Sequence, residues 1–331
     1  MNALRLGTRR SELATTQSRQ VADRLTELTG RAVELVGVTT VGDVTKGALS
    51  QLGGTGVFVS ALRERLIAGE IDFAVHSLKD LPTAPDPRIA LAAVPPRQDP
   101  RDVLIGRAKL ADLPRGARIG TGSPRRVAQL LALREDLECV PIRGNLDTRI
   151  GKVASGELDA IVLAAAGLNR LGRDGEIAQI FEVDEMLPAP GQGALAVECL
   201  AGRADLIELL GVLDDAATRA EVTAERAVLA ALEAGCAAPV GAFALLEREV
   251  HLEREAHLER EAHDARQAHD ARQAHREDPL NLTAAVIAID GTRSVRKSTA
   301  GPAEAAMDLG RACAAAMIAE GAGTLMGERN H

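Results

Sequence analysis

Aromatic residues are almost absent from this sequence of 331 residues, which contains no tryptophan, no tyrosine and only four phenylalanines. Proteins that bind single-stranded nucleic acids stack bases on aromatic side chains, so this composition argues against that mode of binding. An excess of positive charge is also missing, because 39 Lys and Arg face 47 Asp and Glu and give a net charge of −8 at pH 7. This balance argues against broad, nonspecific binding of nucleic acids.

Cysteine is scarce as well. Four cysteines in a chain of this length are too few for a disulfide scaffold, and none of them forms the C-x-x-C pair of a typical zinc site. We therefore expect reduced thiols in a cytoplasmic protein with no bound metal. The N-terminus shows no signal peptide, and no apolar run is long enough to cross a membrane. The four cysteines are Cys139, Cys199, Cys236 and Cys313.

The first half of the sequence alternates between short apolar runs and stretches with helical periodicity. Hydrophobic residues make up 46% of the chain, which is enough for two or three domains with their own cores. Two successive units of β–α–β order are separated by Pro95-Pro96 and Asp99-Pro100, and this order predicts mostly parallel sheets covered by helices. We expect strands at 4–7, 33–39, 73–75, 89–94, 118–120, 140–142 and 160–164, and helices at 11–28, 58–68, 123–134 and 145–155.

The last third of the sequence has a different pattern, which predicts an α+β unit with an antiparallel sheet. It follows a Pro- and Gly-rich segment at 187–193 that we interpret as a linker crossing between units. We expect helices at 204–213, 218–232 and 303–320, and strands at 240–246, 280–289 and 292–296.

A tandem hexapeptide repeat interrupts this last unit at residues 248–278 and contains five of the seven histidines. Six residues turn an α-helix by about 600°, so successive histidines point about 120° apart and cannot form one metal-binding face. We interpret the repeat as a solvated helix or a flexible insert, and a His-rich metal site is the alternative.

Arginines gather at turns that follow predicted strands. In the turn after strand 118–120, Ser123 suits a helix N-cap, Pro124 suits the first helical position, and Arg125 and Arg126 add two guanidinium groups. A helix N-terminus together with arginine forks binds anions, although an ordinary capped helix with a solvated arginine pair has the same local sequence.

Three further turns repeat this arrangement, with arginine beside a predicted strand end. Because open α/β sheets bind ligands at the carboxyl ends of their strands, four such turns imply a ligand with many negative charges. The residues concerned are Arg9 and Ser11, Arg143 and Arg149, and Arg170.

Two other residues are candidates for chemistry. Asp80 lies in His76-Ser-Leu-Lys-Asp80 at a strand end, where it is either a structural cap or ion-pair partner or a carboxylate that exchanges protons with a ligand. Cys236 lies on a turn flanked by Gly235 and Pro239, and it is either a buried inert thiol or a site of covalent attachment.

Taken together, these motifs resemble those of the porphobilinogen deaminase (hydroxymethylbilane synthase) family, over essentially the whole chain. The matching segments are residues 5–11, 76–82, 120–126, 143–149, 163–170, 187–194 and 223–226, followed by Gly235-Cys236. In the loop at residues 51–58, Gln51 and Thr55 stand where members of the family often have lysine, and Lys46 lies nearby.

The resemblance implies an enzyme that joins four porphobilinogen molecules head to tail, releasing four ammonia, to form hydroxymethylbilane in tetrapyrrole (haem) biosynthesis. It implies a dipyrromethane cofactor bound through a thioether to Cys236. The cofactor's acidic side chains would be held by Ser77, Lys79, Ser123, Arg125 and Arg126, and the substrate and growing chain by Arg9, Ser11, Arg143, Arg149 and Arg170. Asp80 would be the catalytic carboxylate, stabilising the positive charge that develops when ammonia leaves.

The fold implied by the resemblance has three domains. Two α/β lobes like those of periplasmic binding proteins would comprise residues 1–95 with 194–211, and residues 99–187. Residues 216–331 would form a smaller α+β domain with an antiparallel sheet that presents Cys236. The family also favours a monomer that contacts neither membranes nor nucleic acids. The competing hypothesis is a non-enzymatic binding protein of the same two-lobed shape, which needs neither the thiol nor Asp80.

Overall fold

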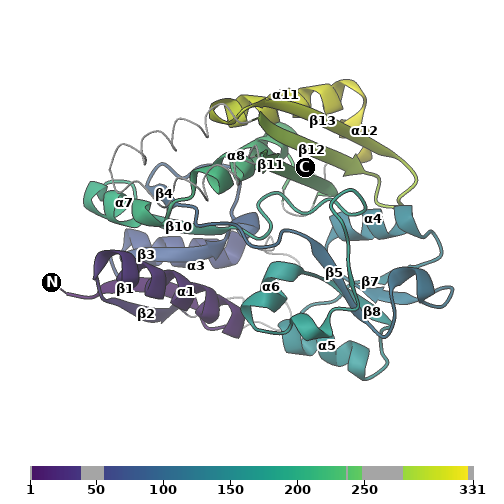
Figure 1. The fold of residues 1–331 in the computed structure, drawn as a ribbon, viewed down its shortest axis with the longest axis horizontal. Coiled ribbons are helices and arrows are strands. Elements are labelled where there is room, and N and C mark those ends of the chain that lie inside the picture. The colour runs from purple at the N-terminus through teal and green to yellow at the C-terminus, as the bar shows by residue number, and fades with distance from the viewer. Residues whose placement is uncertain (1, 39–55, 236–237, 248–278, 327–331) are drawn as a thin grey trace, which may run out of the picture.

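The computed structural model describes residues 2–38, 56–235, 238–247 and 279–326. Cys236, the repeat at 248–278 and the loop with Lys46, Gln51 and Thr55 lie outside these residues. Two α/β lobes lie side by side, and a smaller domain extends across the top of the view in Figure 1. The expected fold class of two α/β lobes and an α+β domain is therefore confirmed.

The first lobe is a five-stranded sheet with helices on both faces. Its strand order is β2(Val33–Val38), β1(Leu4–Arg9), β3(Phe73–Ser77), β10(Leu195–Leu200) and β4(Ile89–Ala93). On one face, α1(Glu12–Thr29) and α7(Ala204–Leu210) bury Leu25 and Leu206 in a core that includes Phe73. On the other face, α3(Gly56–Ile67) buries Leu62 and Leu66.

The second lobe repeats this plan. Its sheet has the order β7(Glu138–Val140), β6(Arg118–Gly120), β8(Ala160–Ala164), β5(Asp102–Gly106) and β9(Gln179–Ile180). Its helices are α4(Pro124–Leu133), α5(Leu146–Ala154) and α6(Ala165–Arg170). Apolar residues lie on both sides of the sheet, with Ile119 and Leu130 in one cluster and Ile161 and Leu168 in the other.

Both sheets differ from the mostly parallel arrangement that the local β–α–β order predicts. β10 is antiparallel to β3 and β4, and β5 is antiparallel to β8 and β9. The sequence analysis missed β5 and β10, because neither belongs to a local β–α–β unit. Each pairs with strands far away in the sequence, so only long-range pairing reveals it.

The third domain contains the antiparallel sheet β11(Val240–Leu246), β12(Pro279–Ile287) and β13(Ser294–Pro302). The helices α8(Ala216–Ala231) and α11(Ala306–Ala319) pack on it and bury Val228, Ala314 and Met317 with Leu282. The two helices approach so closely that a Cβ on Gly310 would overlap the Ala224 carbonyl oxygen. A short helix, α12(Ala322–Leu325), follows, and 3₁₀ turns lie at η1(Leu78–Asp80), η2(Leu110–Asp112), η3(Asp174–Glu176), η4(Gly211–Leu213) and η5(Ala303–Ala305).

Residues 187–194, here called the crossing segment, touch all three domains. The Pro188 carbonyl accepts a hydrogen bond from the Ala242 N–H of the third domain (3.0 Å). At the other end, the Ala194 carbonyl accepts from the Leu78 N–H of the first lobe (3.0 Å). Gly193 has φ 89°, and a Cβ there would overlap the Gln98 carbonyl oxygen. The close approach of two backbones, together with the left-handed conformation, requires glycine at this position.

Gly193→Ala is therefore expected to lower the free energy of unfolding by about 2 kcal/mol or more, because it adds both backbone strain and a steric clash. Urea unfolding of the full chain measures the loss. Gly211→Ala is the matched control, because Gly211 has a helical φ of −58° and open space around a new Cβ. Equal stabilities of the two variants would contradict the requirement for glycine.

Candidate active site

The predicted catalytic residue Asp80 and its neighbour Lys79 lie in η1, the 3₁₀ turn that follows β3. Leu78 anchors this turn, because its side chain is fully buried against Val59, Val94 and Ala196. The Asp80 carboxylate is partly exposed, and within the described residues it accepts no hydrogen bond and forms no ion pair. The structural alternative for Asp80, a cap or an ion-pair partner, therefore has no support in the described part of the chain.

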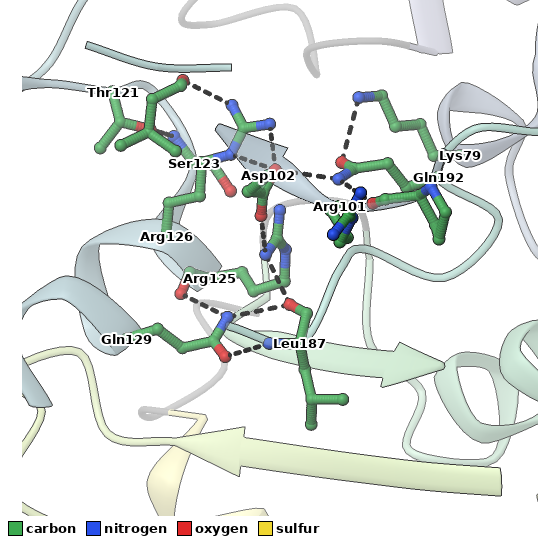
Figure 2. A network of polar contacts seen from close by, with 12 residues as sticks. Lys79, Arg101, Asp102, Thr121, Ser123, Arg125, Arg126, Gln129, Leu187 and Gln192 are labelled. Carbon is green, nitrogen blue, oxygen red and sulfur yellow. Dashed lines mark hydrogen bonds and ion pairs between the residues drawn. The ribbon is translucent and has the colours of Figure 1, made fainter. Parts of the chain in front are cut away.

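Asp102, at the start of β5, is the centre of the polar network in Figure 2. Its side chain is completely buried and accepts from Arg125 Nη1 at 2.6 Å and from Arg126 Nη2 and Nε at 2.7 and 3.1 Å. Burial alone would raise the pKa of the carboxyl, but the two guanidinium groups outweigh it and hold that pKa well below its ordinary range. One carboxylate therefore faces two arginines, and one positive charge remains.

The turn from Thr121 to Arg126 presents these arginines. Ser123 occupies the N-cap position and Pro124 the first helical position of α4, as predicted. The Ser123 side chain, however, makes no capping hydrogen bond; its backbone N–H instead donates to Thr121 Oγ1 (3.2 Å). Arg125 and Arg126 are buried rather than solvated, so the alternative of a solvated arginine pair is wrong.

Gln192 connects this network to Lys79 (Figure 2). Its amide nitrogen donates to Asp102 Oδ1 (2.8 Å), and its amide oxygen accepts from Lys79 Nζ (3.3 Å). Burial and the positive charge of Arg126 lower the pKa of Lys79 to about 8, while Asp80 and Asp102 oppose this shift. Cations from two lobes thus converge on a region that holds excess positive charge.

The remaining predicted arginines belong to the second lobe and to β1. Arg170 is buried and donates from Nη2 to the Gly193 carbonyl (2.8 Å), and burial lowers its pKa to about 10. Arg149 is partly buried and donates from Nε to the Gly144 carbonyl (2.9 Å); burial and then Arg126 lower its pKa. Arg143 is exposed, and Arg9 lies partly buried at the end of β1.

Two predicted serines have local partners. Ser11 caps α1 by accepting from the Ala14 N–H (3.4 Å). Ser77 Oγ accepts from the buried Gln17 Nε2 (3.4 Å). Cys236 lies outside the described residues, so its position relative to this network is not part of the structure.

The third domain contacts η1, the turn that contains Asp80, through Arg226 of α8, one residue of the motif at 223–226. Its guanidinium donates to the carbonyls of Leu78, Leu81 and Pro82 at 3.3, 3.1 and 2.7 Å. Three carbonyls on one guanidinium hold the backbone around Asp80 against α8.

A second contact lies beside Arg226 in the sequence. Glu225 is fully buried and accepts from Arg97 at 2.6 and 3.1 Å, from the Gly191 N–H at 2.7 Å and from the Ala244 N–H at 2.9 Å. Arg97 also lies over the Phe243 ring, 5.4 Å from its centre. The segment that leaves the first lobe after β4, the crossing segment and the third domain therefore meet at one ion pair.

Asp102, Gln192, Arg97 and Glu225 were not among the site residues predicted from the sequence. Gln192 and Glu225 lie in segments that match the family, but neither was given a role there. The two glycines that flank Gln192 were a signal of close backbone packing. Asp102 gave no signal, because an acidic residue near a proline resembles an ordinary loop residue until its partners are known.

Comparisons with known proteins show which family the chain belongs to. A family model described as the porphobilinogen deaminase dipyromethane cofactor binding domain matches residues 4–208, and the model of the porphobilinogen deaminase C-terminal domain matches residues 219–259. The chain belongs to the porphobilinogen deaminase family. Porphobilinogen deaminase 1 of Streptomyces coelicolor is 56% identical over 99% of this chain and 98% of its own length. Porphobilinogen deaminase of Thermobifida fusca is 55% identical over 98% of this chain and 96% of its own length.

Solved structures that match are more distant. The methionine binding protein MetQ is 9% identical with a TM-score of 0.42, covering 64% of this chain and 89% of that chain. The periplasmic VFT2 domain of Bordetella pertussis BvgS is 19% identical with a TM-score of 0.39, and the match covers 63% of this chain and 85% of that domain's chain. In the described residues, no helix is long and apolar enough to span a membrane, and no group of His, Cys, Asp and Glu could hold a metal ion.

Family membership gives the chemistry: the chain is a transferase, a hydroxymethylbilane synthase that uses dipyrromethane as its cofactor. The residues present fit a cofactor with acidic side chains. Arg125 Nε and Arg170 Nε are buried N–H donors with no hydrogen-bond partner among the described residues. Buried guanidinium donors require acceptors, and carboxylates satisfy them best.

Asp102→Asn is expected to lower the free energy of unfolding by about 3–5 kcal/mol at pH 7, because two buried arginines lose their counter-charge. The folded-state pKa of Asp102 lies below its unfolded value of about 3.9, so this stabilisation is complete above pH 4 and is lost as the pH falls. Urea unfolding should show that the difference in the free energy of unfolding between variant and parent is smaller at pH 3 than at pH 7. Asp136→Asn is the control, because that surface carboxylate also pairs with one arginine, Arg134. If Asp102→Asn were as stable as Asp136→Asn at pH 7, Asp102 would not be an essential counter-charge for the two buried arginines.

Proposed function

We propose that Asp80 is the catalytic carboxylate of hydroxymethylbilane synthesis and that the network around Asp102 holds the cofactor. The observation that supports this most directly is that Lys79 lies near Arg125 and Arg126 on one side and near Asp80 on the other, and that the Asp80 carboxylate forms no ion pair with another described residue. The cations of that network can bind the acidic side chains of a pyrrole cofactor, and the Asp80 carboxylate can stabilise positive charge at the reaction centre.

The residues have separate roles in this proposal. Lys79, Ser77, Ser123, Arg125 and Arg126 bind the dipyrromethane, and Cys236 forms the thioether to it. When bound, the cofactor supplies the pyrrole carbon to which the first substrate is joined. Arg9, Ser11, Arg143, Arg149 and Arg170 bind the carboxylates of porphobilinogen and of the growing chain.

Asp80 acts on the substrate. When ammonia leaves porphobilinogen, a positive charge develops on the substrate, and an ionised carboxylate beside the pyrrole N–H stabilises it. The same carboxylate can hold or move the proton that is lost after bond formation. Because Arg226 fixes the carbonyls of Leu78 and Leu81, the carboxylate is held in place rather than carried on a mobile loop.

Two further properties complete the proposal. We infer that the protein acts as a monomer, and the molar mass of the purified chain from light scattering tests this. We also infer a cytoplasmic location; Cys139, Cys199 and Cys313 are free thiols, which fits a reducing compartment.

The covalent link is tested by the intact mass of the purified protein with peptide mapping. We expect an excess equal to two linked pyrrole units on the peptide that contains Cys236, and its complete loss in Cys236→Ser. Cys139→Ser is the matched control and should keep the adduct, since Cys139 is a partly buried thiol of the second lobe. Absorbance near 280 nm is a second readout, because the chain has no tryptophan or tyrosine. No adduct in the parent after addition of porphobilinogen would contradict the covalent link to Cys236.

Asp80→Asn is expected to reduce kcat by about 100-fold or more while the protein folds and keeps the adduct, because the amide cannot offset a developing positive charge. Asp72→Asn is the control: Asp72 lies just before the other end of β3 and pairs with Arg5 at 3.0 Å. That variant should lose stability but keep kcat. Turnover of Asp80→Asn within a few-fold of the parent would refute the assigned role.

A further inference from the structure

Gln192 has a completely buried side-chain amide, whose nitrogen donates two hydrogen bonds and whose oxygen accepts one. Its Nε2 donates to the Pro100 carbonyl (2.7 Å) and to Asp102 Oδ1 (2.8 Å). An amide nitrogen has two donors, and both are used here. A flipped amide would point its oxygen at two acceptors, so the oxygen has to face Lys79 Nζ, 3.3 Å away.

The three residues joined in this way come from different parts of the fold. Lys79 belongs to the first lobe, Asp102 to the second lobe, and Gln192 to the crossing segment between them. We propose that Gln192 is a positioning residue that sets the Lys79 ammonium of one lobe relative to the Arg125 and Arg126 guanidinium groups of the other. The proposal rests on the proposed function, in which these three cations bind one cofactor.

The backbone of Gln192 is fixed independently of its side chain. Its N–H donates to the Ala189 carbonyl (2.8 Å), and its carbonyl accepts from Arg97 Nε (2.8 Å). The flanking Gly191 and Gly193 hold φ values of 76° and 89°. A substitution at position 192 therefore changes the side chain at an anchored point of the chain, which keeps its effect local.

The charges around Lys79 explain why the amide oxygen matters. Arg126 and Arg125 repel the ammonium, whereas Asp80 and Asp102 attract it, and burial disfavours its charge. The amide oxygen of Gln192 is an acceptor for the charged form. Without this acceptor, the ammonium either moves away from the arginines or loses its proton more easily. In both cases Lys79 no longer places a positive charge at the required position relative to Arg125 and Arg126.

Gln192→Met tests the proposal, because methionine keeps the length of the side chain and removes the acceptor. The matched control is Gln129→Met. Gln129 is also buried and also clamps the crossing segment, through its contacts with the Leu187 N–H (2.7 Å) and carbonyl (3.0 Å), but it does not contact Lys79. Both variants lose a buried amide, so a purely structural role predicts the same outcome for both.

Three quantities are measured on the full chain: the fraction of molecules with the adduct on Cys236, the KM for porphobilinogen, and the pH midpoint for acetylation of Lys79 mapped by peptide mass. For Gln192→Met we expect an adduct fraction at least five-fold lower and a downward shift of the midpoint by about one pH unit relative to Gln129→Met. Gln192→Asn, which is too short to reach Lys79, should behave like Gln192→Met and serves if the latter does not fold.

Equal adduct fractions and equal midpoints in the Gln192 and Gln129 variants would overturn the proposal. Lys79→Met separates this result from a failure of the proposed function. If Lys79→Met loses the adduct while Gln192→Met matches Gln129→Met, Lys79 binds the cofactor without help from Gln192. If Lys79→Met keeps the adduct in full, the cofactor role of Lys79 is wrong, and the role of Gln192 is overturned with it.

Discussion

The burial of the Asp102 carboxylate is the constraint on which the rest of the site depends. A buried charge is tolerated only when paired and hydrogen-bonded, and Asp102 meets this condition with Arg125, Arg126 and Gln192. The same contacts decide where those three side chains point. Asp102 also offsets one of the two positive charges of the arginines, so the site keeps an excess of positive charge without two uncompensated buried cations.

A second buried carboxylate connects this site to the third domain. Glu225 accepts from Arg97, from the crossing segment and from β11, and its neighbour Arg226 holds the backbone around η1. Both residues come from one turn of α8, so the helix that precedes Gly235-Cys236 also contacts the turn that contains Asp80. The third domain and the turn that contains Asp80 are thus coupled by direct hydrogen bonds.

Local sequence patterns were sufficient where a structure depends on neighbouring residues. The β–α turn with Ser123, Arg125 and Arg126 follows from a motif of about ten residues. The strands and helices of the third domain follow from local patterns as well, but the pairing of β11 with β12 joins residues as distant as Val240 and Val286. The parallel character of the first two sheets was overestimated, because β5 and β10 pair antiparallel with strands from distant parts of the chain. The capping bond expected from the Ser123 side chain is absent, and the Ser123 backbone N–H donates to Thr121 Oγ1.

The sequence by itself determined the family and the strand ends at which the arginine-bearing turns lie. These depend on short motifs, and the motifs follow from local geometry and chemistry. Only the tertiary structure decided which of those residues face one another. Asp102, Gln192 and Glu225 acquired their roles by burial, since a carboxylate or amide removed from water must find partners wherever the folded chain brings them. Those partners lie 19 to 128 residues away in the sequence, at separations where periodicity and spacing give no information.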